Sequence, residues 1–344
     1  MAYFFSAFLL SVLLTFIVRK LAIRLNVMDI PDGGRKAHSG KVPLLGGAAI
    51  FFAFWAVIFY LFFYPTAGVE LLQEKLLAAF FASLVIMVIG FIDDARPLPA
   101  KIRFLITALA IGAAVLFTPW LGKITNPLGG VLELGLVFGN VLAFFWLLGM
   151  TYTTKILDGL DGLATGIAAI GALMIYFLSS SQKYHQPNVA LLALILAGVL
   201  FGFLLFNFHP AKIFLGESGS LLVGFLLAVL AIIAGGKIAT ALLVLAIPIL
   251  DLARVVYLRL ARGQPISQGD REHLHFRLLD MGMSQRRAVL LLYGVALAFG
   301  LSTLFLQSYQ KLIALLFLVV AMGVAGVWLR RRSPPLYKGR DREG

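Results

Sequence analysis

The chain has 344 residues, of which 61% are hydrophobic and 13% are charged, whereas an ordinary soluble domain is about half apolar and about a quarter charged. This composition excludes an ordinary soluble protein, and nucleic acid is excluded as a partner because the basic residues stand between long apolar runs. The net charge of +13, from 29 basic and 16 acidic residues, is typical of membrane proteins whose basic loops mark topology and contact anionic lipid.

Eleven apolar segments are long enough to cross a membrane, which takes roughly 20 mainly apolar residues. The first segment has no basic residue before it and no small-residue cleavage site, so we interpret it as a retained helix and not as a cleaved signal peptide. The sequence therefore predicts an all-α polytopic membrane protein with about 11 transmembrane helices. The expected helices cover residues 2–24, 44–64, 74–91, 101–119, 136–154, 161–180, 188–206, 216–235, 238–260, 285–307 and 309–330.

The loops between these helices differ in charge from one side to the other. Assigned alternately, 24 of the Lys and Arg residues fall on one side and 5 on the other. Basic loops stay in the cytoplasm, so we expect the N-terminus outside, the C-terminus in the cytoplasm, and a location in the cell inner (cytoplasmic) membrane. Because 13 carboxylates fall on or next to the same side, we expect an active site that faces the cytoplasm.

The domain organisation follows from the same pattern. We expect one transmembrane catalytic domain over residues 1–330, with a cytoplasmic insertion at about 261–284 that is large enough to cap a site. The tail, residues 331–344, mixes charges with prolines and is expected to be a cytoplasmic extension. The chain has no cysteine, which excludes disulfides, thiolate catalysis and cysteine-ligated zinc.

Two adjacent carboxylates, Asp93 and Asp94, close the third expected helix beside Arg96 and Lys101. A carboxylate at the end of a membrane helix is costly unless it is paired or functional. Adjacent acids can share a magnesium-bound substrate or act as base and ligand. The alternative is a hydrated helix end with its own counter-ions.

A second pair of carboxylates, Asp158 and Asp161, lies in the segment Leu-Asp-Gly-Leu-Asp-Gly-Leu over residues 157–163. Residues three apart share a face if the segment is helical, and the glycines, Gly159 among them, let a ligand approach the backbone closely. This composition favours a binding site. The alternative is a capping turn between the fifth and sixth expected helices.

A third polar segment, residues 207–220, leads into the eighth expected helix. Its Gly and Ser residues at a helix start can present free backbone N–H groups to an anion. Glu217 can ligate a hard cation by oxygen, and Phe214 is placed to stack on a planar ring. Phosphate, metal and base could all be bound here. Phe214 alone would more often be a membrane-boundary aromatic, so its assignment depends on the rest of the segment.

The fourth polar segment, residues 270–277, lies in the cytoplasmic insertion and contains His273 and His275. The neighbouring Arg271 and Arg277 make contacts to phosphate or sugar a better interpretation than a zinc site, while an ordinary surface histidine pair is the alternative. Together the four segments indicate chemistry on a phosphorylated lipid with a soluble phosphate donor.

The chain resembles the polyprenyl-phosphate N-acetylhexosamine-1-phosphate transferase family, which includes the enterobacterial-antigen and teichoic-acid initiating enzymes and, more distantly, phospho-N-acetylmuramoyl-pentapeptide transferase. The resemblance runs in order from Arg35 to about Gly282. It is carried by Arg35-Lys36-Ala37-His38 with Pro43 and Gly46-Gly47, Asp93-Asp94, DGLDGLA from Asp158, NFHPAKIFLGESGS from Asn207, Pro248 to Arg254, and HLHFRLL from His273.

The resemblance implies transfer of a sugar 1-phosphate from a UDP-N-acetylhexosamine to polyprenyl phosphate, with release of UMP and with Mg²⁺, or Mn²⁺, as cofactor. It implies catalytic roles for Asp93, Asp94 and Asp158, and metal ligation by Glu217 and Asp94. A catalytic role for Lys155 is our own prediction from this sequence, because Lys155 stands where the family pattern differs. Substrate binding falls, by the same resemblance, to Lys36, His38, Gly159, Leu160, Asp161, Asn207, Phe214, Arg271, His273 and His275.

The chain departs from the family pattern at three places. The family usually has Asn where Lys155 stands, Asp where Glu217 stands, and HHH or H-x-H-H where this chain has His273-Leu274-His275-Phe276. The missing middle histidine argues against the muramoyl-pentapeptide branch, which remains the alternative. Lys155 lies one helical turn before Asp158, and we hypothesise that Lys155 and Glu217 are coupled. The alternative is a snorkelling lysine that only anchors its helix.

Other functions compete with this interpretation. A polyprenyl-phosphate or nucleotide-sugar transporter would suit eleven helices with buried acids, but transporters usually place such acids near the bilayer midplane and here they lie at helix ends. Prenyltransferases and CDP-alcohol transferases also use aspartate pairs with magnesium, but the additional aspartate motifs are missing. The sequence leaves the hexosamine and the oligomeric state open, a homodimer included.

Overall fold

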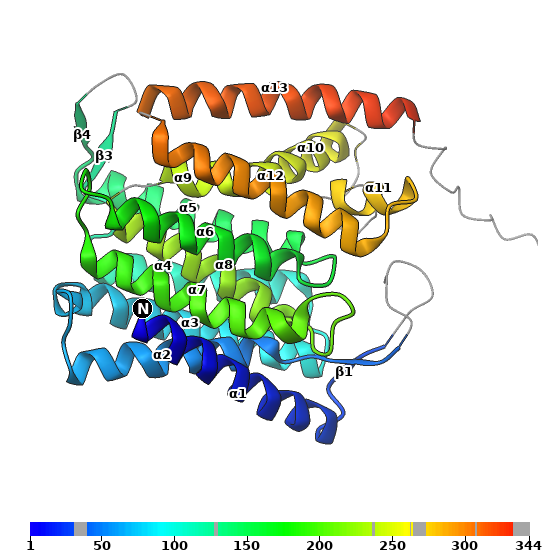
Figure 1. The fold of residues 1–344 in the computed structure, drawn as a ribbon, viewed down its shortest axis with the longest axis horizontal. Helices are drawn as coiled ribbons and strands as arrows, with labels where there is room; N and C mark the ends of the chain where they lie inside the picture. The colour runs from blue at the N-terminus through cyan, green and yellow to red at the C-terminus, as the bar shows by residue number, and fades with distance from the viewer. Residues whose placement is uncertain are drawn as a thin grey trace, which may run out of the picture.

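Helices that run side by side make up almost the whole protein in the computed structural model (Figure 1). The structure describes residues 1–30, 40–126, 130–235, 238–261, 263, 273–306 and 308–332. The predicted site residues Lys36, His38 and Arg271 lie outside these ranges. The helices are α1 (Ala2–Arg24), α2 (Gly46–Phe63), α3 (Gln73–Ala95), α4 (Ala100–Phe117), α5 (Leu136–Leu157), α6 (Leu163–Ser180), α7 (Pro187–Asn207), α8 (Gly216–Ile233), α9 (Ile238–Val244), α10 (Ala246–Ala261), α11 (Leu274–Asp280), α12 (Gln285–Phe305) and α13 (Ser308–Arg332).

Strands are few and short. β1 (Met28–Asp29) pairs with β2 (Val42–Pro43), and β3 (Lys123–Thr125) pairs with β4 (Val131–Glu133), both antiparallel. A 3₁₀ turn, Val69–Leu72, precedes α3. In the described part of the chain, nine helices are long and apolar enough to cross a membrane: α1 to α8 and α12. The prediction of an all-α polytopic membrane protein is confirmed.

The prediction of one continuous helix over residues 238–260 is wrong. The chain forms two helices there, α9 and α10, which meet at Leu245. Pro248 stands three residues later, and proline has no N–H to donate to the carbonyl of Val244 one turn before it. A proline inside a helix is a common cause of such a break.

Helix α8 forms the centre of the bundle. Nearly all of its side chains are buried, and it packs against α5, α3, α2 and α6. Small residues permit these close crossings: a Cβ on Gly47 of α2 would lie 2.4 Å from the nitrogen of Gly219, and one on Gly90 of α3 would lie 2.3 Å from the Cα of Ser218. Close helix approach over small residues is the usual packing of helices in membranes.

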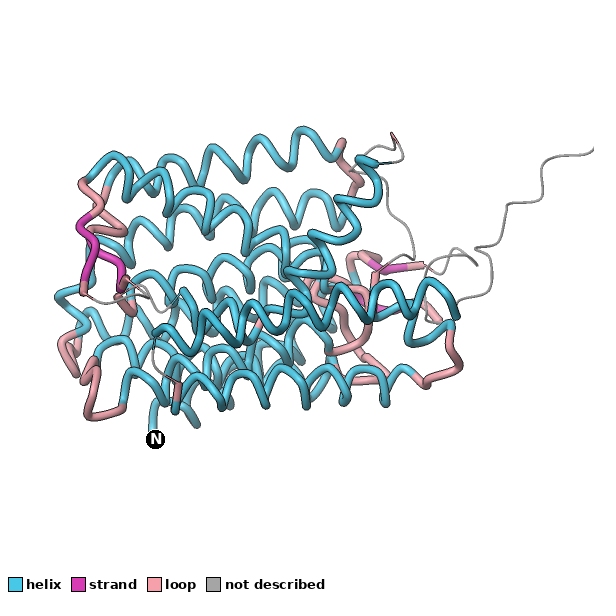
Figure 2. The backbone as a smooth tube through the Cα atoms, turned by 90° about the horizontal axis from the view of Figure 1, so that it is seen from above, coloured by secondary structure: helices cyan, strands magenta, loops and turns pink. Residues whose placement is uncertain are grey.

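The two ends of the bundle differ. The last residues of α3, α5 and α7 and the first residues of α4, α6 and α8 gather at the end that also carries β1 and α11, and we call this end the site end. The hairpin of β3 and β4 lies at the opposite end, as both views show (Figure 2). The polar motifs of the sequence therefore meet at one end, because each stands where a helix ends or begins.

Candidate active site

A cavity of about 720 Å³ opens at the site end. Nine of the residues predicted for the site line it, and they come from the ends of α3, α5, α7 and α8 and from the adjoining loops. The nine are Asp93, Asp94, Asp158, Gly159, Leu160, Asp161, Asn207, Phe214 and Glu217. The structure adds a sixth carboxylate, Asp29 of β1, to the same wall. The acids that are far apart in sequence thus surround one space.

Asp94 caps the first turn of α8. Its Oδ1 accepts a hydrogen bond from the backbone N–H of Glu217 at 2.7 Å, and its Oδ2 accepts from the N–H and the hydroxyl of Ser218 at 3.4 and 2.8 Å. A carboxylate is favourable at a helix N-terminus, where unpaired N–H groups carry partial positive charge. The N–H groups of Glu217 and Ser218 are therefore not free to bind an anion, because Asp94 already accepts from both.

Gly216 allows this capping contact. Its φ of +75° lies in the left-handed region, and a Cβ there would stand 2.4 Å from Oδ2 of Asp94. Only glycine adopts such a backbone without strain. The Gly-Glu-Ser sequence at the start of α8 thus serves to bring the ends of α3 and α8 into contact.

A chain of ion pairs joins α3, α4, α8 and α5. Nη1 of Arg103 pairs with Asp93, whose Oδ1 also accepts from the N–H of Leu98 at 2.7 Å. The same guanidinium lies 3.4 Å from Oε2 of Glu217, and the ammonium of Lys155 pairs with Oε1 of Glu217. The contact hypothesised between Lys155 and Glu217 is present.

Sequence reasoning missed Arg103. It stands among the basic residues at the start of α4, two positions after Lys101, and nothing in the pattern separates the two. The distinction is spatial: Lys101 is exposed, whereas Arg103 is partly buried between Asp93 and Glu217.

Asp158, which follows the last residue of α5, has the open carboxylate of the cavity: among the described residues it has no side-chain hydrogen bond or ion pair. Burial, together with the carboxylates of Asp94, Glu217 and Asp161, raises the pKa of Asp158 to about 8. Burial is the largest cause of this rise, and the three neighbouring carboxylates add to it, which indicates an excess of negative charge around Asp158. A cation bound here would relieve that excess.

Asp161 and Asn207 hold the loop between α7 and α8. Oδ2 of Asp161 contacts Nδ1 of His209 at 2.7 Å and accepts from the N–H of Ala211 at 3.1 Å. Asn207 is buried, donates to the carbonyl of Ile213 at 3.0 Å, and accepts from the hydroxyl of Thr165 at 2.7 Å. Both side chains therefore shape the wall that they line, whatever they contact in a substrate.

Phe214 is fixed through its backbone. Its N–H donates to the carbonyl of Pro43 at 2.9 Å, and its carbonyl accepts from the N–H of Gly46 at 3.0 Å. The half-buried side chain lines the cavity. Its stacking on a base stays a prediction.

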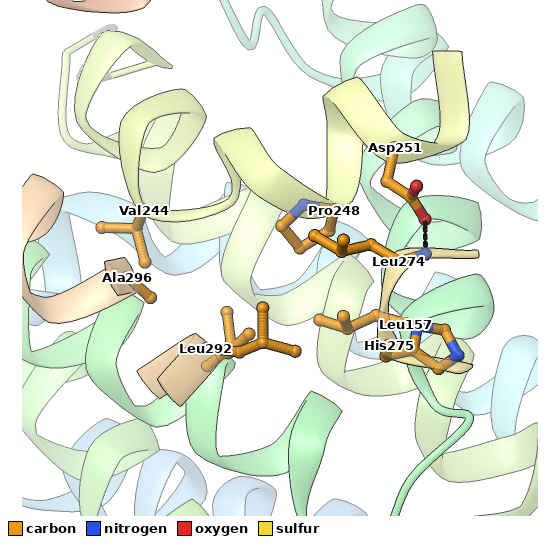
Figure 3. Close-up of a pocket in the computed structure, with 9 residues that line it drawn as sticks. Leu157, Val244, Pro248, Asp251, Leu274, His275, Leu292 and Ala296 are labelled. Carbon is orange, nitrogen blue, oxygen red and sulfur yellow. Dashed lines mark hydrogen bonds between the residues drawn. The ribbon is translucent and has the colours of Figure 1, made fainter. Parts of the chain in front are cut away.

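His273, the N-cap of α11, and His275, within α11, lie beside the cavity and do not line it. Nδ1 of His273 contacts Oδ2 of Asp251 at 2.9 Å. The N–H of Leu274 donates to the same oxygen at 3.0 Å (Figure 3). His275 is buried against Gly159: a Cβ on Gly159 would stand 2.2 Å from Nε2 of His275. The described part of the insertion thus packs on the Asp158–Gly159 turn.

The carboxylates suit a divalent cation in their chemistry, since Mg²⁺ and Mn²⁺ prefer oxygen ligands. Within the ranges that the structure describes, no three acidic or histidine side chains form a ligand cluster. Asp93, Asp94 and Glu217 are each bonded to protein donors instead. Asp158 fits a cation because its carboxylate is open, and a bound cation would favour the charged form of this carboxylate over the repulsion of its neighbours.

Comparison with known proteins agrees with the family resemblance. Residues 76–235 match the model of a family described as "Glycosyl transferase family 4". The chain is 31% identical to a probable undecaprenyl-phosphate N-acetylglucosaminyl 1-phosphate transferase of Bacillus subtilis (strain 168), over 93% of this chain and 89% of the relative. It is 33% identical to a decaprenyl-phosphate N-acetylglucosaminephosphotransferase of Mycobacterium tuberculosis (93% and 86%) and 29% identical to an undecaprenyl-phosphate alpha-N-acetylglucosaminyl 1-phosphate transferase of Escherichia coli K12 (95% and 90%).

Proposed function

This chain belongs to glycosyl transferase family 4, and on that premise we propose that it transfers N-acetylhexosamine 1-phosphate from a UDP-sugar to polyprenyl phosphate. In this reaction a phosphate oxygen of the lipid attacks the phosphorus that carries the sugar. The bond from that phosphorus to the bridging oxygen breaks, and UMP leaves with that oxygen. The product is a polyprenyl-diphosphate-linked sugar for cell-envelope glycan synthesis.

The observation that carries the proposal is the agreement between similarity and geometry. The similarity to polyprenyl-phosphate sugar-1-phosphate transferases extends over nearly the whole chain. The family match, residues 76–235, contains Asp93, Asp94, Asp158, Asp161 and Glu217. These five carboxylates line one cavity at one end of a membrane bundle, which supports a site where a lipid phosphate and a soluble donor meet.

The side chains of the cavity suit these substrates. The diphosphate of the donor and the phosphate of the lipid bring negative charge to a site that already has an excess of it. A divalent cation, with Asp158 as its open ligand beside Asp94 and Glu217, would offset this charge. Arg103 and Lys155 add two fixed positive charges to the same region. Asp93 and Asp94, at the C-terminal end of α3, remain the candidates that orient or deprotonate the lipid phosphate.

The donor would occupy the same cavity. Phe214 is placed to stack on uracil, and Gly159 and Leu160 also line the cavity. Asp161 has one carboxylate oxygen engaged by His209 and Ala211, which leaves the other oxygen to accept from a ring N–H. We assign the site end to the cytoplasmic face of the inner membrane, because the basic loops cluster on that side.

Product analysis of the purified chain in detergent tests the proposal. UDP-N-acetylglucosamine and UDP-N-acetylgalactosamine are supplied with and without polyprenyl phosphate and Mg²⁺, and UMP and the lipid product are measured. Release of UMP that requires both the lipid and the cation supports the proposal. Absence of UMP with either sugar contradicts it, and UMP release without the lipid points to a covalent phosphosugar intermediate.

A further inference from the structure

The carboxylate of Glu217 lies between two positive charges, those of Arg103 and Lys155. This arrangement bears on how tightly the carboxylate can bind a divalent cation. We propose that the Lys155 ammonium is a resident counter-ion of Glu217 that competes with a divalent cation for the same carboxylate and so sets the cation affinity of the site. The inference rests on the proposed function only in taking a divalent cation to bind beside Asp158.

The contacts of Glu217 are the first support. Lys155 pairs with Oε1 and Arg103 lies 3.4 Å from Oε2. The side chain of Glu217 is 12% exposed and that of Lys155 is 24% exposed, so water screens the pair only in part. A carboxylate neutralised at both oxygens offers little to a metal ion unless one of the two cations moves.

Lys155 is the cation that can move. Arg103 is held by two carboxylates, those of Asp93 and Glu217. Among the described residues, the only ion pair of Lys155 is with Glu217, and its ammonium otherwise faces the ring of Tyr152 at 5.6 Å. A lysine is a compact charge on a flexible four-carbon stem. It can therefore leave Glu217 when a divalent cation arrives, at a cost to the affinity of that cation.

A structural role for the pair is the competing explanation, since it also joins α5 to α8. That interface has contacts of its own: a Cβ on Gly224 of α8 would lie 2.7 Å from the carbonyl of Met150, and Trp146 donates to the carbonyl of Ala228 at 3.0 Å. Loss of an ion pair that only held the two helices together would weaken or disorder the site. Loss of a competing cation would strengthen metal binding.

The test measures Mn²⁺ binding to the full chain in detergent by the electron paramagnetic resonance signal of free Mn²⁺, without substrates. Lys155→Met keeps the length of the side chain and removes its charge, and we expect it to bind Mn²⁺ at least tenfold more tightly than the parent chain. Lys155→Arg keeps the charge and should bind within about twofold of the parent. Lys101→Met, which removes an exposed charge from the start of α4, should also stay within twofold.

A second variant keeps the inference testable if Lys155→Met fails to fold. Glu217→Gln removes the shared carboxylate and should weaken Mn²⁺ binding at least tenfold. Unchanged or weaker binding in a folded Lys155→Met chain, or unchanged binding in Glu217→Gln, overturns the inference. If Mn²⁺ binding shifts as expected but no UMP is released in the transfer assay, the proposed function fails and the inference stands.

Discussion

Two Lys–Glu pairs, one at each end of the bundle, differ in surroundings far more than in chemistry. Lys123 and Glu133 join the strands of the hairpin at 2.7 Å, with side chains 67% and 75% exposed. Lys155 and Glu217 join α5 to α8, with side chains 24% and 12% exposed. An exposed pair contributes roughly 0–1 kcal/mol to stability because water screens it. A partly buried pair interacts more strongly, and loss of one partner leaves an uncompensated charge.

Position in the fold, and not residue type, therefore distinguishes the functional carboxylates from the others. Glu133 lies in the hairpin of β3 and β4, at the end of the bundle opposite to the site end. Glu217 lines the cavity together with five other acids. Substitutions at the two ends should therefore have effects of very different size, and the predictions below compare them directly.

The largest effect is expected from neutralising the site carboxylates. Asp93→Asn, Asp94→Asn and Glu217→Gln should each lower kcat by about two or more orders of magnitude, the scale on which loss of a positioned catalytic group is felt. Glu133→Gln, the matched change at the opposite end, should leave kcat within about twofold. The measurement is UMP release at saturating substrates, and near-normal rates in Asp93→Asn and Glu217→Gln would contradict the assignment.

The next effect concerns the contact between α3 and α8. Gly216→Ala should lower stability by at least about 2 kcal/mol and reduce turnover, because its left-handed backbone disfavours a side chain by about 1–2 kcal/mol and its Cβ would collide with Asp94. Gly68→Ala is the control, since Gly68 has the same φ of +75° and a Cβ there would meet only Leu71, at 3.6 Å. Thermal unfolding in detergent should show a clearly larger loss at Gly216, and equal losses would mean that the collision is relieved.

A smaller effect is expected at the donor site. Phe214→Ala should raise the KM for the UDP-sugar about tenfold, because stacking of a base on an aromatic ring is worth about 1–3 kcal/mol. Phe117→Ala, at the exposed end of α4, serves as the control and should change KM by less than twofold. Equal use of GDP-linked and UDP-linked sugars by the parent chain would count against the assignment.

The smallest effect compares the two Lys–Glu pairs themselves. In a double-mutant cycle, Lys155→Asn, Glu217→Asp and the combined variant should show a coupling of at least about 0.5 kcal/mol in kcat/KM across a Mg²⁺ titration. The double variant should be less impaired than the sum of the singles. The equivalent cycle on Lys123 and Glu133 should be additive. Additivity at both pairs would leave Lys155 as an anchor of α5 and remove it from the site.

The sequence predicted what depends on local pattern. Long apolar runs predicted most of the helices. The carboxylates line one cavity, as expected, because each motif stands at a helix end on the same side of the bundle. The break between α9 and α10 had a local signal in Pro248, but the apolar run around it resembles a continuous span.

What the sequence did not predict depends on contacts between distant segments. The capping of α8 by Asp94 joins residues more than 120 positions apart, and the selection of Arg103 over Lys101 depends on how α4 lies beside Glu217. The pairing of His273 with Asp251 is of the same kind. Residue type and spacing do not identify the partners in these three contacts, since the contacts arise only when the helices pack.

Transfer of the phosphate together with the sugar is tested most directly by the fate of a labelled atom. UDP-N-acetylglucosamine carrying ³²P in the phosphate next to the sugar is incubated with the purified chain, polyprenyl phosphate and Mg²⁺, and the lipid and water phases are separated. We predict that the label enters the lipid product while unlabelled UMP is released. Label that stays in water as UDP, with sugar alone on the lipid, would contradict sugar-1-phosphate transfer.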